Sequence, residues 1–566
     1  VLAAQEGSLG SVPERYSSDS QAELLRLQRA LAAAAADMRK LGSGLEAKLS
    51  SEELGLFEVY IRLLDDRTLI GEVEAAIEAG QTARSAWASV MQRHVRTFRK
   101  MDDAYLRDRA ADIDDLGRRV LGYLQRERRE SVPLPRRIVL VGEELSATTL
   151  ADIPINRLAG MVSVRGSSNS HIAIIGRALG IPTVMGAVDL PWPELEGHEL
   201  VVDGFRGDVI TQPSRAVRRT YVGRQREEKL LAQDLAKLTD QPCVTTDGQP
   251  LALWVNTGLR QESRISKKVG AEAVGLYRTE ISFFARNSFP TEDEQVATYR
   301  QQLRDFAPRP VTMRTLDIGG DKALPYFPIE EANPFLGWRG IRISLDHPDI
   351  FLTQIRAMLR ASAGFNNLRI LLPMISNIPE LEQALALIDR AYAELTQEEG
   401  YQLQPPKVGA MIEVPAAVYQ VRDIGRRVDF LSVGTNDLTQ YLLAVDRNNP
   451  RVADLYHTMH PAVLRALQTI REKADSVGCE LSVCGEMAGD PLGAVLLLGL
   501  GYQRLSMSAS SLLRVKSMLS QVSHAEAKAL VKRAMRLSDA GQVRQLFIKR
   551  LDRPELTKLY RPLLNL

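Results

Sequence analysis

Short strand-like runs recur eight times between about Gln241 and the C-terminus, and this recurrence constrains the fold more than any other feature of the sequence. Each run is rich in β-branched and other apolar residues, and a segment with helical spacing separates it from the next run. Eight such repeats over about 325 residues predict a (β/α)8 barrel with insertions, with a doubly wound sheet as the alternative. The runs are Leu251–Val255, Ala273–Leu276, Val311–Leu316, Ile370–Met374, Val408–Ile412, Phe430–Val433, Leu481–Cys484 and Leu505–Met507.

Polar and charged residues fall at the predicted carboxyl ends of five of these strands. Catalytic residues of (β/α)8 barrels come from that end of several strands, so these side chains predict a site at one mouth of the barrel. The five segments are Arg278-Thr279-Glu280, Arg314-Thr315-Leu316-Asp317, Glu413-Val414-Pro415, Gly434-Thr435-Asn436-Asp437 and Cys484-Gly485-Glu486.

The basic side chains of this region predict an anion site. Guanidinium groups bind phosphate and carboxylate bidentately, which suits a ligand that carries both groups. The alternative for any single one of these residues is a surface position or an ordinary ion pair. The set consists of Arg278, Arg314 and Arg447, with Lys322.

The acidic side chains of the same region predict a metal site. Glu413 and Asp437 offer two hard oxygen ligands for Mg²⁺, and Asn436 can add a donor or an acceptor. The alternative for Glu413 and Asp437 is that they form ion pairs with the arginines of the same region. A free cysteine such as Cys484 is ordinarily a small, buried, apolar residue. The position of Cys484 at a predicted strand end makes it a candidate weak acid that faces the site.

The N-terminal part of the chain has a helical pattern. Residues 1–19 have no clear periodicity and are expected to form an irregular lead-in. Residues 20–128 are dominated by Ala, Leu, Glu and Arg, and proline is absent between Pro13 and Pro133, which predicts a bundle of uninterrupted helices. A packing or dimerisation domain and a docking surface for another protein are both open. The apolar positions at helical spacing include Leu24, Leu27, Leu31, Leu54, Phe57, Ile61 and Leu64.

A small α/β domain is predicted for residues 129–214. Its polar and charged continuation, residues 215–240, has Arg and Glu at favourable helical spacing and is expected to be an exposed linker helix. The expected strands are Ile138–Val141, Gly160–Val164, Pro182–Met185 and Leu200–Gly204, and a closing hairpin is expected to involve Gly207–Ile210.

His171 lies between two of these strands. The sequence predicts a helix that is capped by Asn169 or Ser170 and that ends at Gly180, so that His171 falls in its first turn. There the unpaired N–H groups and the helix dipole favour a phosphoryl anion and a neutral, nucleophilic imidazole. A capped helix with an incidental histidine is the alternative.

Composition narrows the class of protein. A chain of 566 residues implies several domains, and 72 basic against 70 acidic residues give no reason to expect a nucleic acid or a charged membrane surface as partner. There is no run of about 18 apolar residues and no signal peptide, which predicts a cytoplasmic protein. Three cysteines are too few for a disulfide scaffold and fit a reducing compartment. Because the first residue is Val, we expect a fragment of a longer protein.

Four longer motifs resemble enzyme I of the phosphoenolpyruvate-dependent phosphotransferase system, in the order in which that family has them. The resemblance extends from about residue 20 to 520. The motifs are Gly275-Leu276-Tyr277-Arg278-Thr279-Glu280, Glu331-Ala332-Asn333-Pro334-Phe335-Leu336-Gly337-Trp338-Arg339-Gly340, Ser432-Val433-Gly434-Thr435-Asn436-Asp437-Leu438-Thr439-Gln440-Tyr441 and Val483-Cys484-Gly485-Glu486-Met487-Ala488-Gly489.

This resemblance implies a multidomain α/β enzyme. Residues 20–128 would be a helical docking domain for a histidine-containing phosphocarrier protein, residues 129–214 the phosphohistidine domain, and residues 241–566 a TIM-type barrel that binds phosphoenolpyruvate and forms a homodimer. His171 would be phosphorylated, with release of pyruvate. Arg278, Arg314, Asn436 and Arg447 would bind the ligand, Glu413 and Asp437 would hold Mg²⁺, and Cys484 would give a proton to the enolate.

The segment before His171 is similar to the nitrogen-related branch of enzyme I. It has Arg165-Gly166 and then Asn169-Ser170-His171 where many sugar-branch relatives have Gly-Gly and then Thr-Ser-His. That branch usually carries an N-terminal GAF sensor domain, and the Val1 start fits removal of such a domain. The alternatives are a dikinase or phosphoenolpyruvate synthase, which requires an ATP-grasp domain that is not found here, and a catalytically idle signalling scaffold, against which the complete set of site residues argues.

Overall fold

The computed structural model forms two compact units, one built on Val1–Glu227 and one on Glu228–Leu564, and each is described here by itself. No helix within the described ranges is long and apolar enough to cross a bilayer. The structure describes residues 2–3, 12–45, 64, 67–99, 104–125, 135–145, 153–165, 172–173, 176, 180–204, 206–258, 265–284, 288–320, 324, 326–447, 449 and 451–560.

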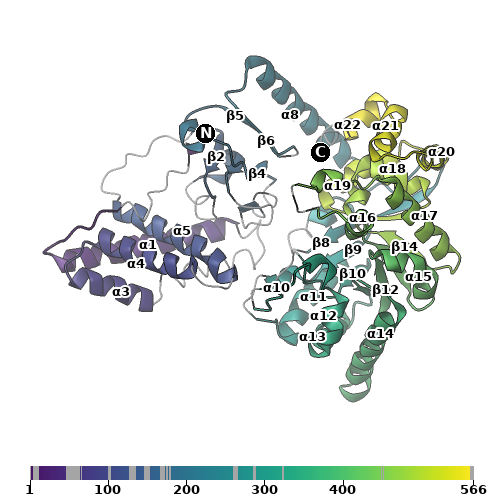
Figure 1. Ribbon diagram of the computed structural model, residues 1–566, viewed down its shortest axis with the longest axis horizontal. Helices are drawn as coiled ribbons and strands as arrows, with labels where there is room; N and C mark the ends of the chain where they lie inside the picture. The colour runs from purple at the N-terminus through teal and green to yellow at the C-terminus, as the bar shows by residue number, and fades with distance from the viewer. Residues whose placement is uncertain are drawn as a thin grey trace. The chain divides into compact units, whose positions relative to one another are not determined.

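The first unit begins with the expected helical bundle, whose helices lie alongside one another in Figure 1. Leu27 and Leu31 of the predicted apolar stripe are buried, as is Leu64, whereas Leu54, Phe57 and Ile61 lie outside the described residues. The fully buried indole of Trp87 donates a hydrogen bond to the Gly117 carbonyl at 2.8 Å and so joins two of the helices. The helices are α1 (Ser20–Leu45), α3 (Arg67–Glu78), α4 (Ala83–Arg99) and α5 (Ala104–Gln125).

A four-stranded parallel sheet in the order β1-β2-β3-β4 forms the rest of this unit, with an antiparallel hairpin of β5 and β6. The strands predicted between residues 138 and 210 are confirmed. Leu2–Ala3, in the segment expected to be irregular, pairs with β2 as an edge strand. The strands are β1 (Leu2–Ala3), β2 (Ile138–Gly142), β3 (Leu158–Ser163), β4 (Thr183–Met185), β5 (Leu200–Asp203) and β6 (Asp208–Thr211).

The second unit is a closed barrel of eight parallel strands, β8 to β15, in which β15 pairs with β8. Each of the eight predicted strand-like runs is confirmed, and the doubly wound alternative is wrong because the sheet closes on itself. The short strand β7 adds to β8 in antiparallel orientation. The strands are β7 (Cys243–Val244), β8 (Pro250–Thr257), β9 (Val274–Arg278), β10 (Val311–Arg314), β11 (Leu368–Leu372), β12 (Lys407–Ile412), β13 (Phe430–Val433), β14 (Glu480–Val483) and β15 (Arg504–Met507).

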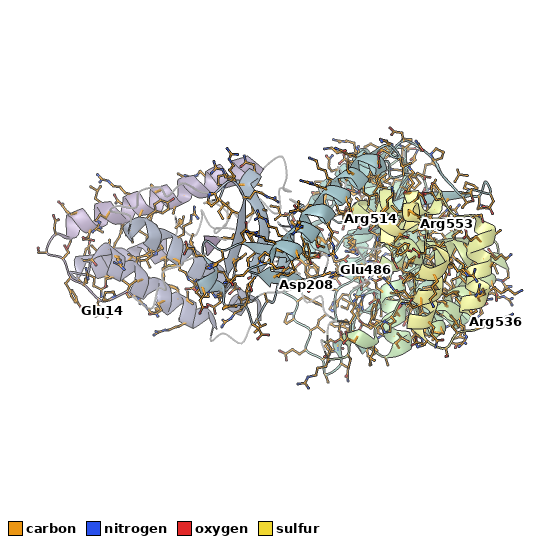
Figure 2. All side chains as sticks on the ribbon, turned by 90° about the horizontal axis from the view of Figure 1, so that it is seen from above. Glu14, Asp208, Glu486, Arg514, Arg536 and Arg553 are labelled. Atoms are coloured by element: carbon orange, nitrogen blue, oxygen red, sulfur yellow. The ribbon has the colours of Figure 1, made fainter. Side chains whose placement is uncertain are left out.

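Helices surround the barrel, as Figure 1 shows. The C-terminal helices α20 to α22 pack on α18 and α19 and complete this outer layer. Arg514 and Arg553, labelled among these helices in Figure 2, bind the Leu559 carbonyl and the Glu526 carboxylate. The helices include α8 (Arg215–Ala236), which crosses the boundary of the units, α10 (Ile281–Phe284), α11 (Glu292–Phe306), α12 (Ile341–Asp346), α13 (Pro348–Ser362), α14 (Ile378–Ala393), α15 (Pro415–Gly425), α16 (Thr435–Leu443), α17 (Pro461–Asp475), α18 (Pro491–Gly499), α19 (Ala509–Leu519), α20 (His524–Ala534), α21 (Ala540–Arg550) and α22 (Pro554–Tyr560).

The inside of the barrel is closed at the amino-terminal end of the strands by a buried arginine. The guanidinium of Arg369 stacks on the ring of Phe430, 3.9 Å from its centroid, and faces Trp254 at 5.4 Å. It also binds the Glu480 carboxylate at 2.7 Å. Burial of both stacked faces lets one charged side chain fill this end of the barrel.

We expect Arg369→Ala to lower the free energy of unfolding of the barrel by about 3 kcal/mol, because it removes the stacking and leaves the Glu480 carboxylate without its main partner. Denaturant unfolding followed by tryptophan fluorescence measures this change. The control Lys237→Ala removes an ion pair whose two side chains are 74% and 59% exposed, and it should leave the unfolding midpoint unchanged. An Arg369→Ala midpoint equal to that of the wild type would contradict the role given to this residue.

Candidate active site

The guanidinium of Arg339, whose side chain is completely buried, is the centre of a charged cluster at the carboxyl ends of the barrel strands. It donates hydrogen bonds to both carboxylate oxygens of Asp317, at 3.2 and 3.3 Å, and to both of Asp437, at 3.2 Å each. It also donates to the Tyr441 hydroxyl at 3.3 Å. Burial alone would lower the pKa of Arg339, but the charges of Asp317 and Asp437 raise it on balance, so the side chain stays cationic.

Arg314, at the end of β10, extends the cluster. Its guanidinium binds the Asp317 carboxylate at 2.9 Å and forms a short ion pair with Glu280. Burial opposes its charged form, but Glu280 and Asp317 together raise its pKa. The predicted strand-end residue Arg314 is therefore neither on the surface nor free to move, since two carboxylates hold it.

Glu413 follows β12, is fully buried, and differs from the other acids described so far in that no arginine among the described residues binds it directly. Its Oε1 accepts a hydrogen bond from the Met374 N–H at 2.7 Å, whereas its Oε2 has no hydrogen-bond partner among the described residues. A Cβ atom at Gly434 would come within 2.5 Å of that oxygen, so the glycine leaves the space beside it open. Burial raises the pKa of Glu413, and the negative charges of Asp437 and Asp317 add to the effect.

The backbone that serves Glu413 is strained. Met374 has a φ of 57°, a left-handed conformation that costs a non-glycine residue free energy. This conformation aims the Met374 N–H at the Glu413 carboxylate. Strain of this kind persists where the surrounding structure enforces it, and it is commonest at functional sites.

The buried charges of the cluster do not cancel. Two guanidinium groups face four carboxyl groups, so with all four carboxyls ionised the cluster has two negative charges in excess. A divalent cation would balance that excess, and the open space at Glu413 Oε2 fits a cation ligand. Within the described ranges no group of three or more His, Cys, Asp or Glu side chains is arranged to hold a metal ion. The members of the cluster are Glu280, Arg314, Asp317, Arg339, Glu413 and Asp437.

The other predicted ligand-binding residues flank the cluster at the same mouth. Arg278 ends β9 with its side chain exposed, and Arg447 approaches Asp437 at 3.9 Å. Asn436, in the first turn of α16, uses its side-chain oxygen to accept the Glu486 N–H at 2.9 Å. Lys322 lies outside the described residues. Exposed guanidinium at the rim and buried carboxylates below it can together bind an anion through a shared cation.

Cys484 follows β14 and lies inside the barrel. The residue is 4% exposed and lies among apolar side chains of the barrel interior, and its thiol points toward the Val433 carbonyl at 3.6 Å. Burial raises its pKa to about 11, so the thiol stays protonated at neutral pH. A protonated thiol can give a proton, whereas it is a poor nucleophile or metal ligand.

His171, with Asn169 and Ser170, lies outside the described residues. The end of its predicted helix is described: Gly180 has a φ of 67°, and the Ile181 N–H bonds the Gly176 carbonyl at 2.9 Å. This pattern is typical of a helix that terminates at a glycine, which confirms the predicted stop.

The central residue of the cluster does not stand out in the sequence. Arg339 lies within one of the longer motifs, and Asp317 and Glu280 follow arginines at predicted strand ends. The signal that could have found Arg339 is its place between Gly337 and Gly340, since Gly340 has a φ of 59° and any Cβ there would lie 3.3 Å from Asp317 Oδ1. A second missed residue is Gln354 of α13, which binds the Leu316 N–H at 2.8 Å and the Thr279 hydroxyl at 3.2 Å.

Three family descriptions match the chain in succession. Residues 3–109 match the N-terminal domain of the phosphoenolpyruvate-utilising enzymes, residues 134–207 their mobile domain, and residues 232–524 their phosphoenolpyruvate-binding domain. The described cluster lies wholly within the third match.

Similar proteins cover nearly the whole chain. A protein of Escherichia coli (strain K12) named "Phosphoenolpyruvate-dependent phosphotransferase system" is 43% identical over 98% of this chain and 75% of its own length. The "Phosphoenolpyruvate-protein phosphotransferase" of Staphylococcus carnosus (strain TM300) is 37% identical over 93% of this chain and 92% of its own. A solved structure titled "N-terminal domain of Enzyme 1 - Nitrogen" is 34% identical, covers 41% of this chain and 94% of that one, and has a TM-score of 0.32. The chain belongs to the phosphoenolpyruvate-protein phosphotransferases, which are enzymes that transfer a phosphoryl group from phosphoenolpyruvate to a protein.

Proposed function

We propose that this enzyme phosphorylates its own His171 with phosphoenolpyruvate at a Mg²⁺ site in the barrel, and then passes the phosphoryl group to a histidine of a phosphocarrier protein of the nitrogen-related branch. The observation that carries the proposal is the buried cluster around Arg339, in which four carboxyl groups face two buried guanidinium groups and Glu413 Oε2 has no hydrogen-bond partner among the described residues. Such a cluster needs a cation, and the arginines at its rim need an anion.

Glu413 and Asp437 are the residues that would hold Mg²⁺. When bound, the ion would neutralise charge on the oxygens of the transferring phosphoryl group. Arg278 and Arg447, which are less buried than Arg314 and Arg339, would bind the phosphate and carboxylate of the substrate. Arg339 would keep Asp437 in place, since its guanidinium fixes both oxygens of that carboxylate.

His171 would attack phosphorus in line with the enolate leaving group, and positioning supplies most of the catalysis in such transfers. Cys484 would then give its proton to C3 of the enolate. The burial that keeps this thiol protonated supports that role. Release of the ketone form of pyruvate drives the formation of the phosphohistidine.

The parts of the chain outside the barrel would serve the second transfer. The helical bundle of residues 20–128 would dock the phosphocarrier protein, and the barrel would form a homodimer. The Asn169-Ser170-His171 segment supports a nitrogen-branch carrier, because this segment differs from the sugar branch at the residue two before the histidine.

With labelled phosphoenolpyruvate and Mg²⁺, we expect acid-labile, base-stable label on the wild-type chain together with pyruvate, and no label on His171→Ala, because no other nucleophile is proposed. A repeat with labelled ATP should give no label, since the proposal uses no nucleotide. Absence of label on correctly folded wild type would contradict the proposed function, and ATP-dependent label would favour a dikinase.

Glu413→Gln should abolish Mg²⁺-dependent stabilisation. At Mg²⁺ near ten times its Kd the wild type should gain about 1.4 kcal/mol, which thermal unfolding detects as a rise in Tm. The variant should melt at least as high as the wild type without Mg²⁺, because it removes a buried charge whose Oε2 has no partner. An unchanged Mg²⁺ response in Glu413→Gln would exclude this carboxylate as a ligand.

Arg339→Lys should lower kcat/KM by about 100-fold or more, because a lysine ammonium cannot make paired hydrogen bonds to two carboxylates at once. Steady-state pyruvate release measures this change. The matched control is Arg342→Lys, three residues along, whose guanidinium binds the Leu336 and Gly337 carbonyls outside the cluster. Equal losses in the two variants would show that the effect is not specific to the cluster.

A further inference from the structure

The turn that carries Cys484 is held from two sides by asparagine side chains. On one side the Asn256 Nδ2 of β8 donates a hydrogen bond to the Cys484 carbonyl at 2.9 Å. On the other side Asn436 Oδ1 accepts the Glu486 N–H at 2.9 Å. The Cys484 N–H continues the sheet and donates to the Val433 carbonyl at 3.0 Å. The backbone on both sides of the thiol is therefore fixed.

The orientation of the Asn256 amide is determined by its partners. The Cys484 carbonyl can only accept, so the amide nitrogen must face it, and the amide oxygen then accepts the Ser506 hydroxyl at 2.6 Å. Ser506 is fully buried. Gly275 of β9 leaves room for this hydroxyl, because a Cβ atom at Gly275 would lie 2.4 Å from the Ser506 oxygen.

Close packing prevents the turn from moving toward α16. A Cβ atom at Gly485 would lie 1.8 Å from the Thr435 hydroxyl oxygen and 2.8 Å from the Thr435 nitrogen. The Cys484 side chain belongs to the buried apolar cluster that includes Met411 and Phe430. The turn is packed against Thr435 on one side. On the other side, the hydrogen bond from Asn256 holds the Cys484 carbonyl in place and so restricts the position of the attached Cα and thiol.

We propose that Asn256, oriented by Ser506, is a positioning residue that aims the Cys484 thiol at C3 of the enolate formed after phosphoryl transfer. This inference rests on the proposed function. In the step that Asn256 supports, the S–H bond breaks, the proton binds C3 through the electron pair of the C=C bond, and the C2–O bond becomes a carbonyl. The thiolate that remains takes a proton from water.

The contacts of Asn256 separate its role from that of the charged cluster. Its amide binds the Cys484 carbonyl and the Ser506 hydroxyl. The groups proposed to bind the substrate phosphate and Mg²⁺ are other residues, namely Arg278, Glu413, Asp437 and Arg447. Loss of Asn256 should therefore impair proton transfer to C3 and leave the transfer of phosphorus to the protein largely intact.

The test uses the full chain, Mg²⁺ and phosphoenolpyruvate stereospecifically tritiated at C3, in D₂O. Protonation by a fixed thiol gives pyruvate with a chiral methyl group, whereas enolpyruvate released into solution gives a racemic one. For Asn256→Ala we expect a racemic methyl group while rapid-quench phosphorylation of the protein stays within about threefold of the wild type. Cys484→Ala should behave in the same way, and adding Asn256→Ala to it should cause no further loss, since two residues that act in one step are not additive.

Asn256→Asp and Ser482→Ala complete the design. The carboxylate of Asn256→Asp has the shape of the amide but cannot donate to the Cys484 carbonyl, so it should also give a racemic product even if the alanine variant folds poorly. Ser482 of β14, two residues before Cys484, donates instead to the Leu431 carbonyl at 3.3 Å, and Ser482→Ala should keep the methyl group chiral. A chiral product from both Asn256 variants, or phosphorylation reduced as much as protonation, would overturn the proposal. An unlabelled wild-type protein would contradict the proposed function instead.

Discussion

The site depends on a balance of charges that are out of contact with water. Arg339 is completely buried and is stable there only because Asp317 and Asp437 surround its guanidinium. Those carboxylates in turn need the arginine, and Glu413 beside them has no such partner for one of its oxygens. The cluster therefore has more acidic than basic groups. Strand ends hold part of it in place, since Arg314 ends β10 and Glu413 follows β12, while Arg339 reaches it from the insertion after β10.

Much of the barrel follows from sequence pattern. Residues alternate along each strand. In β13, Leu431 and Val433 point outward to the helices while Phe430 and Ser432 point inward, so the strand is apolar on one side and mixed on the other. Eight runs of this kind, separated by helical segments, favour a closed parallel barrel, and a parallel barrel places the carboxyl end of every strand at one mouth. That is why residues as far apart as Arg314 and Glu413 could be expected to meet.

Sequence pattern does not reveal the pairing inside the site. Arg339 lies in an insertion after β10, away from any strand end, so no strand rule identifies it. The partner of each carboxylate depends on loop conformations such as the left-handed Met374 and Gly340, and side-chain pattern carries no information about those angles. Asn256 looks like an ordinary residue near the end of a strand, and its contact with Cys484 exists only because the first barrel strand lies near the seventh.

The closure of β15 on β8 has a consequence for how the protein folds. Most pairs of strands in the barrel are consecutive in sequence, so their contacts join residues much closer along the chain than the contacts of β15 with β8 do. The contact of Asn256 with Ser506 joins residues 250 positions apart, and the contact with Cys484 spans 228. The turn at Cys484 is thus held by contacts of long sequence separation, and a chain that has formed every strand pair except β15 with β8 still lacks the contact of Asn256 with Ser506. Because contacts of long sequence separation require larger chain closures, we expect the turn at Cys484 to become ordered late in folding.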